Sequence, residues 1–235
     1  MKKTISIILS IIFAVSLIIV LFFTSMDITI YGSMPQSFVN ECVKYDVLDD
    51  VGVTEEDLAD VTVQMFEYLR GNREQLSDIK TTINGQPDTY FFNEKECMHM
   101  ADCRRLFTAG YAIRRYCIIL CIILLAVVLL INRKNIQEGW HALAVGTLSG
   151  TIGFIAVLAI LGSLIAANFR EYFTRFHLIF FDNDLWILDP TKDRLLMIMP
   201  EGYFMDCVKS IALYFAAGLA VLLLASILKL KHDKK

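Results

Sequence analysis

The stretch NEKECMHMADCRRLFTAGYAIRRYCIILCIILLAVVLLI, from Asn93 to Ile131, passes from a charged start into an apolar run. Asn93 followed three residues later by Glu96 is a capping-box pattern, which is typical of a helix N-terminus. No helix-breaking signal follows before Ile131, and residues 116–131 carry no charged side chain. About 20 apolar residues are enough to cross the hydrocarbon core of a bilayer. The stretch therefore predicts one long helix that begins at Glu94 and ends inside a membrane.

The composition of the whole chain agrees with a membrane protein. Of its 235 residues, 56% are hydrophobic and only 20% are charged, which is too apolar for an ordinary soluble domain. Six cysteines are too few for a disulfide scaffold. The net charge of −3 gives no basic surface for nucleic acid, so a nucleic-acid partner is not expected.

Four apolar blocks predict four transmembrane helices, over residues 4–26, 106–132, 141–169 and 207–229. The first block follows Lys2 and Lys3, as a signal peptide would, but its apolar run is longer than the usual ~7–15 residues. It also lacks a cleavage site of small residues. We therefore interpret it as an uncleaved first span.

Basic residues near the span ends predict the orientation. Lysine or arginine is enriched at the N-terminus, in the loop after the second span and in the C-terminal tail. The positive-inside rule places these three regions, and hence both termini, in the cytoplasm. Segments 27–105 and 170–206 are then extracytoplasmic.

The first of these segments has the signals of a small folded domain. Thr54 followed by three acidic residues predicts a helix start, and Gly71 predicts its end. Asn84-Gly85 between extended runs predicts a β-hairpin. We expect an α-helical integral membrane protein with four transmembrane helices and a small extracytoplasmic α+β domain between spans 1 and 2. The loop 170–206 is predicted to be helical to about Phe181 and irregular beyond it.

Two histidines are the strongest candidates for chemistry. The topology brings His99 and His177 to the same membrane face, and histidine is the usual proton shuttle near neutral pH. The alternative is that each is only a hydrogen-bonding residue of the interface. On a helix, Asp102 and Cys103 share a face with His99. Asp102 can therefore orient the imidazole.

Other interpretations of these residues stay open. A zinc site is a weak alternative because no C-x-x-C motif is present. Cys103 can be a nucleophile paired with His99. A disulfide can form among the four cysteines of the outer segments, which are Cys42, Cys97, Cys103 and Cys207. A cluster of arginines can bind lipid phosphates or simply extend to the interface; its members are Arg104, Arg105, Arg114 and Arg115.

Two motifs carry a resemblance to a known family. Residues 92–102, FNEKECMHMAD, resemble the signature F-x-x-x-E-x-x-H-M-x-D-V of the bacterial lipoprotein intramolecular transacylases, with Cys103 in place of the aliphatic residue. Residues 176–190, FHLIFFDNDLWILDP, are similar to the second signature of that family. The resemblance covers nearly the whole chain and includes the four-span layout.

The resemblance implies a defined reaction. The substrate is a diacylated bacterial lipoprotein whose N-terminal Cys carries a diacylglyceryl group and a free α-amino group. The sn-2 acyl chain moves from the glycerol oxygen to that amine, which gives the lyso-form lipoprotein. We expect no cofactor and no metal. We expect a location in the bacterial cytoplasmic membrane, with the active site at the outer face.

Within this reaction we expect His99 to be the principal acid and base, with Asp102 orienting it and His177 assisting. Asn183, Trp186 and protonated His177 each have a donor for the oxyanion, and the sequence does not choose between them. Two alternative functions stay open: a non-catalytic membrane protein that binds lipid or lipoprotein, and a cysteine-dependent acyltransferase or lipid hydrolase. The oligomeric state is not predicted.

Overall fold

The computed structural model describes residues 2–32 and 34–234, which form two compact units. The polar unit comprises Asp27–Gly110 and Phe169–Ser210, and the helical unit comprises the other described residues. Three helices contribute to both units, which are α1 (Lys2–Tyr31), α5 (Glu94–Ile131) and α9 (Glu201–His232). The long helix expected from Glu94 to Ile131 is confirmed.

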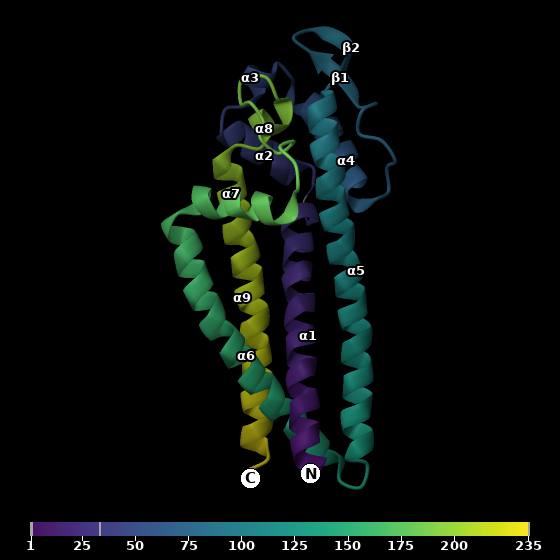
Figure 1. The fold of residues 1–235 in the computed structure, drawn as a ribbon, viewed down its shortest axis with the longest axis vertical. Coiled ribbons are helices and arrows are strands. Elements are labelled where there is room, and N and C mark those ends of the chain that lie inside the picture. Colours follow the sequence, from purple (N-terminus) through teal and green to yellow (C-terminus); the bar gives the residue numbers. More distant parts are fainter. Residues whose placement is uncertain (1, 33, 235) are drawn as a thin grey trace. The chain divides into compact units, whose positions relative to one another are not determined.

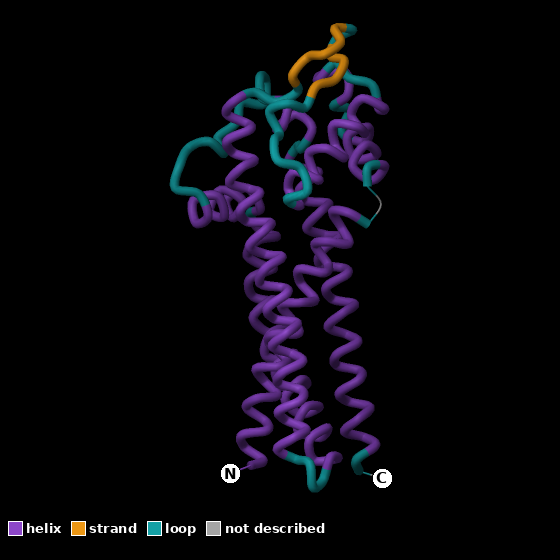
Figure 2. Tube along the Cα trace, turned by 90° about the vertical axis from the view of Figure 1, so that its right-hand side faces the viewer, coloured by secondary structure: helices purple, strands orange, loops and turns teal. Residues whose placement is uncertain are grey.

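The helical unit is a bundle of four helices (Figure 1). In the described part of the chain, α1, α5, α6 (Ile136–Ala167) and α9 are long and apolar enough to cross a membrane. Many of their large apolar side chains are exposed, such as Leu130 and Leu213, as expected for surfaces that contact lipid. Both chain ends lie at the same end of this bundle (Figure 2).

Small residues allow α1 and α6 to approach closely. A Cβ atom added to Gly146 would lie 2.3 Å from the Cβ of Ser10, and one added to Gly150 would lie 2.9 Å from the Cβ of Ala14. Ser10 and Ala14 are both fully buried. Glycines four residues apart on one helix face are typical of close helix packing in membranes. The close packing of α1 against α6 therefore requires glycine at positions 146 and 150.

The polar unit contains the short elements of the chain. Its first segment forms α2 (Gln36–Lys44), α3 (Leu48–Val51), α4 (Glu55–Arg70), β1 (Lys80–Ile83), β2 (Gln86–Tyr90) and the start of α5. Its second segment forms α7 (Phe169–Phe180), α8 (Arg194–Ile198) and the start of α9.

Local signals in the first segment are confirmed. Thr54 caps α4 by accepting a hydrogen bond from the backbone N–H of Asp57, and Gly71 ends the helix with φ +90°. The strands pair antiparallel around Asn84 and Gly85, which both have positive φ, as a tight hairpin turn requires.

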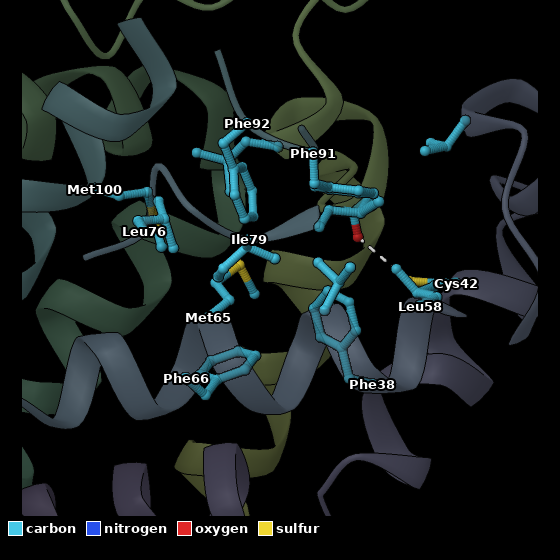
Figure 3. Close-up of a cluster of buried hydrophobic side chains, with 14 of the residues drawn as sticks. Phe38, Cys42, Leu58, Met65, Phe66, Leu76, Ile79, Phe91, Phe92 and Met100 are labelled. Atoms are coloured by element: carbon cyan, nitrogen blue, oxygen red, sulfur yellow. Dashed lines mark hydrogen bonds between the residues drawn. The ribbon is translucent and has the colours of Figure 1, made fainter. Parts of the chain in front are cut away.

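One hydrophobic core joins the two segments of the polar unit (Figure 3). Side chains of the first segment such as Phe38 and Leu58 are buried in it together with Leu195 and Ile198 of the second. The Cys42 thiol also donates to the Ile198 carbonyl over 3.4 Å. The expected domain between the first two spans is therefore incomplete alone, because its core includes residues that follow the third membrane helix.

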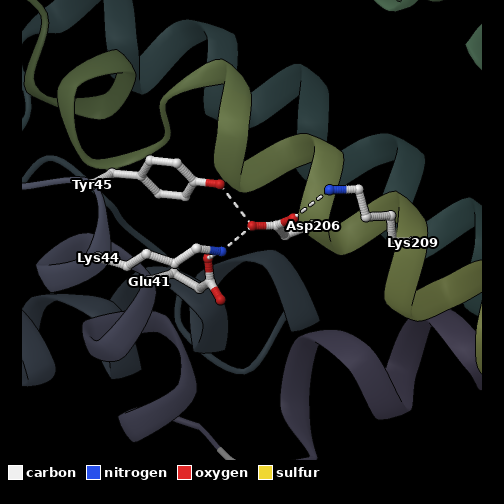
Figure 4. Close-up of polar contacts among 5 residues, drawn as sticks. All are labelled: Glu41, Lys44, Tyr45, Asp206 and Lys209. Carbon is white, nitrogen blue, oxygen red and sulfur yellow. Dashed lines mark hydrogen bonds and ion pairs between the residues drawn. The ribbon is translucent and has the colours of Figure 1, made fainter.

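A polar cluster joins the same two segments (Figure 4). Asp206 at the start of α9 accepts a hydrogen bond from the Tyr45 hydroxyl over 2.6 Å. It also forms ion pairs with Lys44 and Lys209. These three contacts hold the pKa of Asp206 well below its ordinary value. Asp206 thus fixes α2 against the start of α9 through a carboxylate that stays ionised.

Candidate active site

The capping box at the start of α5 fixes the helix turn that leads to His99. The backbone N–H of Asn93 donates to the Glu96 carboxylate over 2.6 Å, and the Asn93 side chain accepts from the Glu96 N–H over 3.0 Å. These reciprocal bonds satisfy two groups that a helix start otherwise leaves unpaired. His99 follows within one turn and is only 8% exposed.

The second histidine lies on α7, whose sequence is rich in aromatic residues. His177 is 7% exposed, and its Nδ1–H donates to the Phe173 carbonyl over 2.7 Å. Trp186 stacks on the imidazole, with ring centroids 4.9 Å apart and an interplanar angle of 28°. Because Nδ1 carries the donated proton, the neutral ring presents Nε2 as a free proton acceptor.

The fold brings the two histidines together. Their ring centroids are 6.1 Å apart at an interplanar angle of 32°. Phe181 contacts both rings, with centroid distances of 5.4 Å to His99 and 5.5 Å to His177. Two residues distant in sequence therefore form one compact pair inside an aromatic environment.

Hydrogen bonds between α5 and the second segment hold this pair in place. The Asn93 amide donates to the Asp193 carboxylate over 2.7 Å, and the Leu195 backbone N–H donates to Glu96 over 2.6 Å. Lys95 donates to the carbonyl of Ile187. The capping-box pattern predicts only the first role of Glu96, because nothing local in the sequence shows that its carboxylate also accepts from the distant Leu195 N–H.

Glu96 carries the most demanding of these contacts. The residue is 1% exposed, and burial raises the pKa of its carboxyl group. The backbone N–H groups of Asn93 and Leu195 offset part of the desolvation cost, because their hydrogen bonds stabilise the ionised carboxylate. Removing the acceptor would leave the Leu195 N–H unpaired inside the protein.

The expected role of Asp102 is wrong in its geometry. Its carboxylate does not orient the His99 ring, since one oxygen accepts from Arg105 and the other from the Asn183 amide, each over 2.9 Å. The Nδ1 atom of His99 is buried without a hydrogen-bond partner. Asp102 acts on His99 through its charge instead, which raises the pKa of the imidazole.

Both imidazoles are neutral at neutral pH. Burial, together with the neighbouring His177, lowers the pKa of His99 to about 4 despite the opposing charge of Asp102. Burial also lowers the pKa of His177, partly offset by the hydrogen bond to Phe173. A pair of unprotonated imidazoles is suited to accepting a proton and passing it on.

Cys103 lies beside the histidine pair but is not activated. Its Sγ is 3.5 Å from the Nε2 of His99, and burial raises the pKa of the thiol to about 12. A thiol that keeps its proton is a poor nucleophile. In the part of the chain that the structure describes, all six cysteines are free and no group of three or more His, Cys, Asp or Glu side chains is arranged to hold a metal.

The four arginines do not form a uniform group. The Arg104 guanidinium donates to the carbonyls of Glu74 and Gly71 and lies over the Tyr68 ring, so its contacts are structural. Arg105 pairs with Asp102 and is strongly exposed. Of the other two, which belong to the helical unit, Arg114 lies over the Tyr111 ring and Arg115 is exposed.

These features define a class of protein: a helical membrane protein whose polar unit buries two neutral histidines beside an indole. The family model of the lipoprotein intramolecular transacylase Lit matches residues 11–204. The chain therefore belongs to this family, and it is an acyltransferase that acts in a membrane.

Solved structures share this fold. The membrane-integral lipoprotein intramolecular transacylase Lit from Bacillus cereus is 19% identical, with a TM-score of 0.76 over 98% of both chains. A variant of that protein with a histidine replaced by alanine has a TM-score of 0.70, also at 19% identity, over 98% of this chain and 96% of the other. No curated protein matches the sequence significantly.

Proposed function

We propose that this enzyme moves the sn-2 acyl chain of a diacylglyceryl lipoprotein to the α-amino group of the lipoprotein's N-terminal Cys. The product is the N-acylated, lyso-form lipoprotein, and no free fatty acid is released. The observation that carries the proposal is the buried histidine pair, with ring centroids 6.1 Å apart. Such a transfer needs proton management and no enzyme nucleophile, and the protonated Cys103 thiol agrees with that.

The reaction can be followed proton by proton. The substrate amine attacks the ester carbonyl carbon, and the free Nε2 of His177 accepts the amine proton. The tetrahedral intermediate then collapses. His177 passes the accepted proton to His99, and His99 donates that proton to the departing glycerol oxygen. One proton leaves nitrogen and one reaches oxygen, so the enzyme returns to its starting state. Amine and ester belong to one molecule, which favours the reaction through proximity.

The charge distribution supports an outer location for the polar unit. Residues 26–110 contain 16 acidic and seven basic residues, whereas the short loop after α5 and the C-terminal tail are basic. We propose that both termini are cytoplasmic, in accord with the positive-inside rule, and that the histidines work at the outer face of the cell membrane. Membrane lipid and the lipoprotein are then the partners, and the exposed Arg105 and Arg115 are the arginines best placed for phosphates.

Mass spectrometry of a synthetic diacylated lipopeptide tests the function directly. After incubation with the protein in lipid vesicles, we expect a product of unchanged mass whose N-terminus no longer reacts with an amine-labelling reagent. Loss of one acyl chain would instead indicate a hydrolase, and unchanged substrate would indicate a binding protein.

Two variants test the proposed chemistry in the same assay. His99→Ala should abolish most transfer while the protein still inserts and folds, because it removes the proposed proton donor. Cys103→Ala should retain nearly full activity, because no covalent bond to sulfur is formed. Loss of activity in Cys103→Ala, together with an acyl-enzyme adduct on the wild-type protein, would contradict the direct transfer.

A further inference from the structure

Trp186 stacks on His177 and brings an aromatic N–H donor to the histidine pair. The indole Nε1 is buried and has no hydrogen-bond partner. Five buried side-chain N or O atoms lack a partner among the described residues, and two of them, Trp186 Nε1 and His99 Nδ1, belong to rings that contact or neighbour His177. Buried polar groups without partners are rare in folded proteins because they lose their bonds to water. Two such groups beside the proposed base His177 are therefore candidates to contact a polar group of the substrate.

The other candidate donors at this site already have partners. The Asn183 amide donates to Asp102, and Asn183 is exposed to solvent. The Nδ1–H of His177 donates to the Phe173 carbonyl. The Arg105 side chain is 81% exposed and bonded to Asp102. Among these candidates, the indole N–H, which can only donate, is the donor that is buried and without a hydrogen-bond partner among the described residues.

The spacing suits an acceptor that develops negative charge. The indole and imidazole centroids are 4.9 Å apart. In acyl transfer, the base lies about 3 Å from the nucleophile and the oxyanion donor about 3 Å from the carbonyl oxygen. Because the indole and imidazole rings stack against each other, a substrate group that reaches the imidazole edge also lies close to the indole. The ring stacking also fixes the indole, so little reorganisation is needed during the reaction.

We propose that the Trp186 Nε1–H is the oxyanion donor of this enzyme. The assignment rests on the proposed acyl transfer. When the amine nitrogen bonds to the ester carbon, the carbonyl π electrons move to oxygen, and the indole N–H stabilises that charge. When the C–O bond to glycerol breaks, the carbonyl reforms and the indole bond weakens. Trp186 neither gains nor loses a proton.

A conservative substitution isolates the N–H. Trp186→Phe keeps an aromatic ring on His177 but removes the donor. Because an oxyanion donor contributes mainly in the transition state, we expect kcat to fall about 100-fold with KM nearly unchanged. Trp186 replaced by 3-benzothienylalanine, which carries sulfur in place of the N–H at almost the same shape, should show a similar loss. Trp140→Phe, which changes the other tryptophan, on α6, is the matched control and should match wild type.

The outcomes separate this proposal from the proposed function. If wild type converts the lipopeptide and both Trp186 variants keep kcat within threefold, the oxyanion role is wrong and the transfer stands. A change in KM alone would show that Trp186 contributes only to binding and would also overturn it. If wild type gives no N-acylated product, the function itself fails. Thermal unfolding of each variant checks that the benzothienyl protein is folded as wild type is.

Discussion

The chemistry of single residues depends on which hydrogen bonds they make elsewhere. His177 is held by the Phe173 carbonyl, one turn earlier on α7, and this bond decides which nitrogen is free. His99 has no comparable bond at Nδ1. The sequence identifies both histidines, yet it gives the leading role to His99 and an orienting role to Asp102. Helical spacing places Asp102 near His99, but the two carboxylate oxygens of Asp102 accept hydrogen bonds from Arg105 and Asn183.

The burial of His99 predicts a pH dependence of stability. Its pKa is about 4 in the folded protein and about 6.5 when exposed, so the unfolded chain binds the proton more tightly. The stability contribution is therefore complete above pH 6.5 and is lost as the pH falls toward 4. Each kcal/mol corresponds to roughly 2–4 °C in Tm for a protein of this size.

Thermal unfolding in detergent at pH 7.5 and 4.5 measures this effect. We expect the wild-type Tm to fall by several degrees more between these values than the Tm of His99→Gln, which has no proton to bind. His232→Gln, in the exposed tail, is the control and should show the wild-type difference. Equal pH dependence in wild type and His99→Gln would show that His99 is not buried as a neutral group.

At the scale of helices and strands, short-range signals are reliable predictors. The capping box at Asn93, the Thr54 cap and the Asn84-Gly85 turn each specify a backbone conformation within a few residues, and each is found. Contacts between elements have no such signal. Nothing around Glu96 indicates that its second oxygen meets Leu195, because that pairing depends on the fold of the whole polar unit.

The close packing of α1 and α6 leads to a prediction with an internal control. Gly146→Ala puts a Cβ 2.3 Å from that of Ser10, so the helices must separate and the protein should lose roughly 1–3 kcal/mol of stability. Gly153→Ala, on the same helix, meets nothing within 4 Å. There alanine should be neutral or slightly stabilising, because it has the higher helix propensity. Tm values in detergent compare the two, and similar values would contradict the packing.

At the scale of the molecule, the polar unit is one compact structure made from two stretches of chain. Its core combines Phe38 and Leu58 with Ile198, and its polar cluster combines Tyr45 with Asp206. The sequence pattern predicts both stretches, but it predicts a domain for the first and a loop for the second. Hydrophobic residues of the second, such as Leu195, carry no mark of the partners that they meet.

A substitution in one stretch should therefore weaken the other. A Cβ added to Gly202 would lie 2.4 Å from the Tyr45 ring, so Gly202→Ala forces the start of α9 away from α2. We expect faster amide hydrogen exchange not only near residue 202 but also in α4, by severalfold. Gly162→Ala, which meets nothing within 4 Å, is the control. Exchange in α4 that stays at the wild-type rate would show that the stretches fold independently.

The shared core also has a consequence for synthesis. The ribosome completes residues 27–110 well before α8, which supplies Leu195 and Ile198 to their core. Until the third membrane helix has been inserted and the second stretch has followed it, Phe38 and its neighbours lack part of their cover. The first stretch therefore stays incompletely folded during synthesis. Its core is completed only after α6 has entered the membrane and α8 has been synthesised.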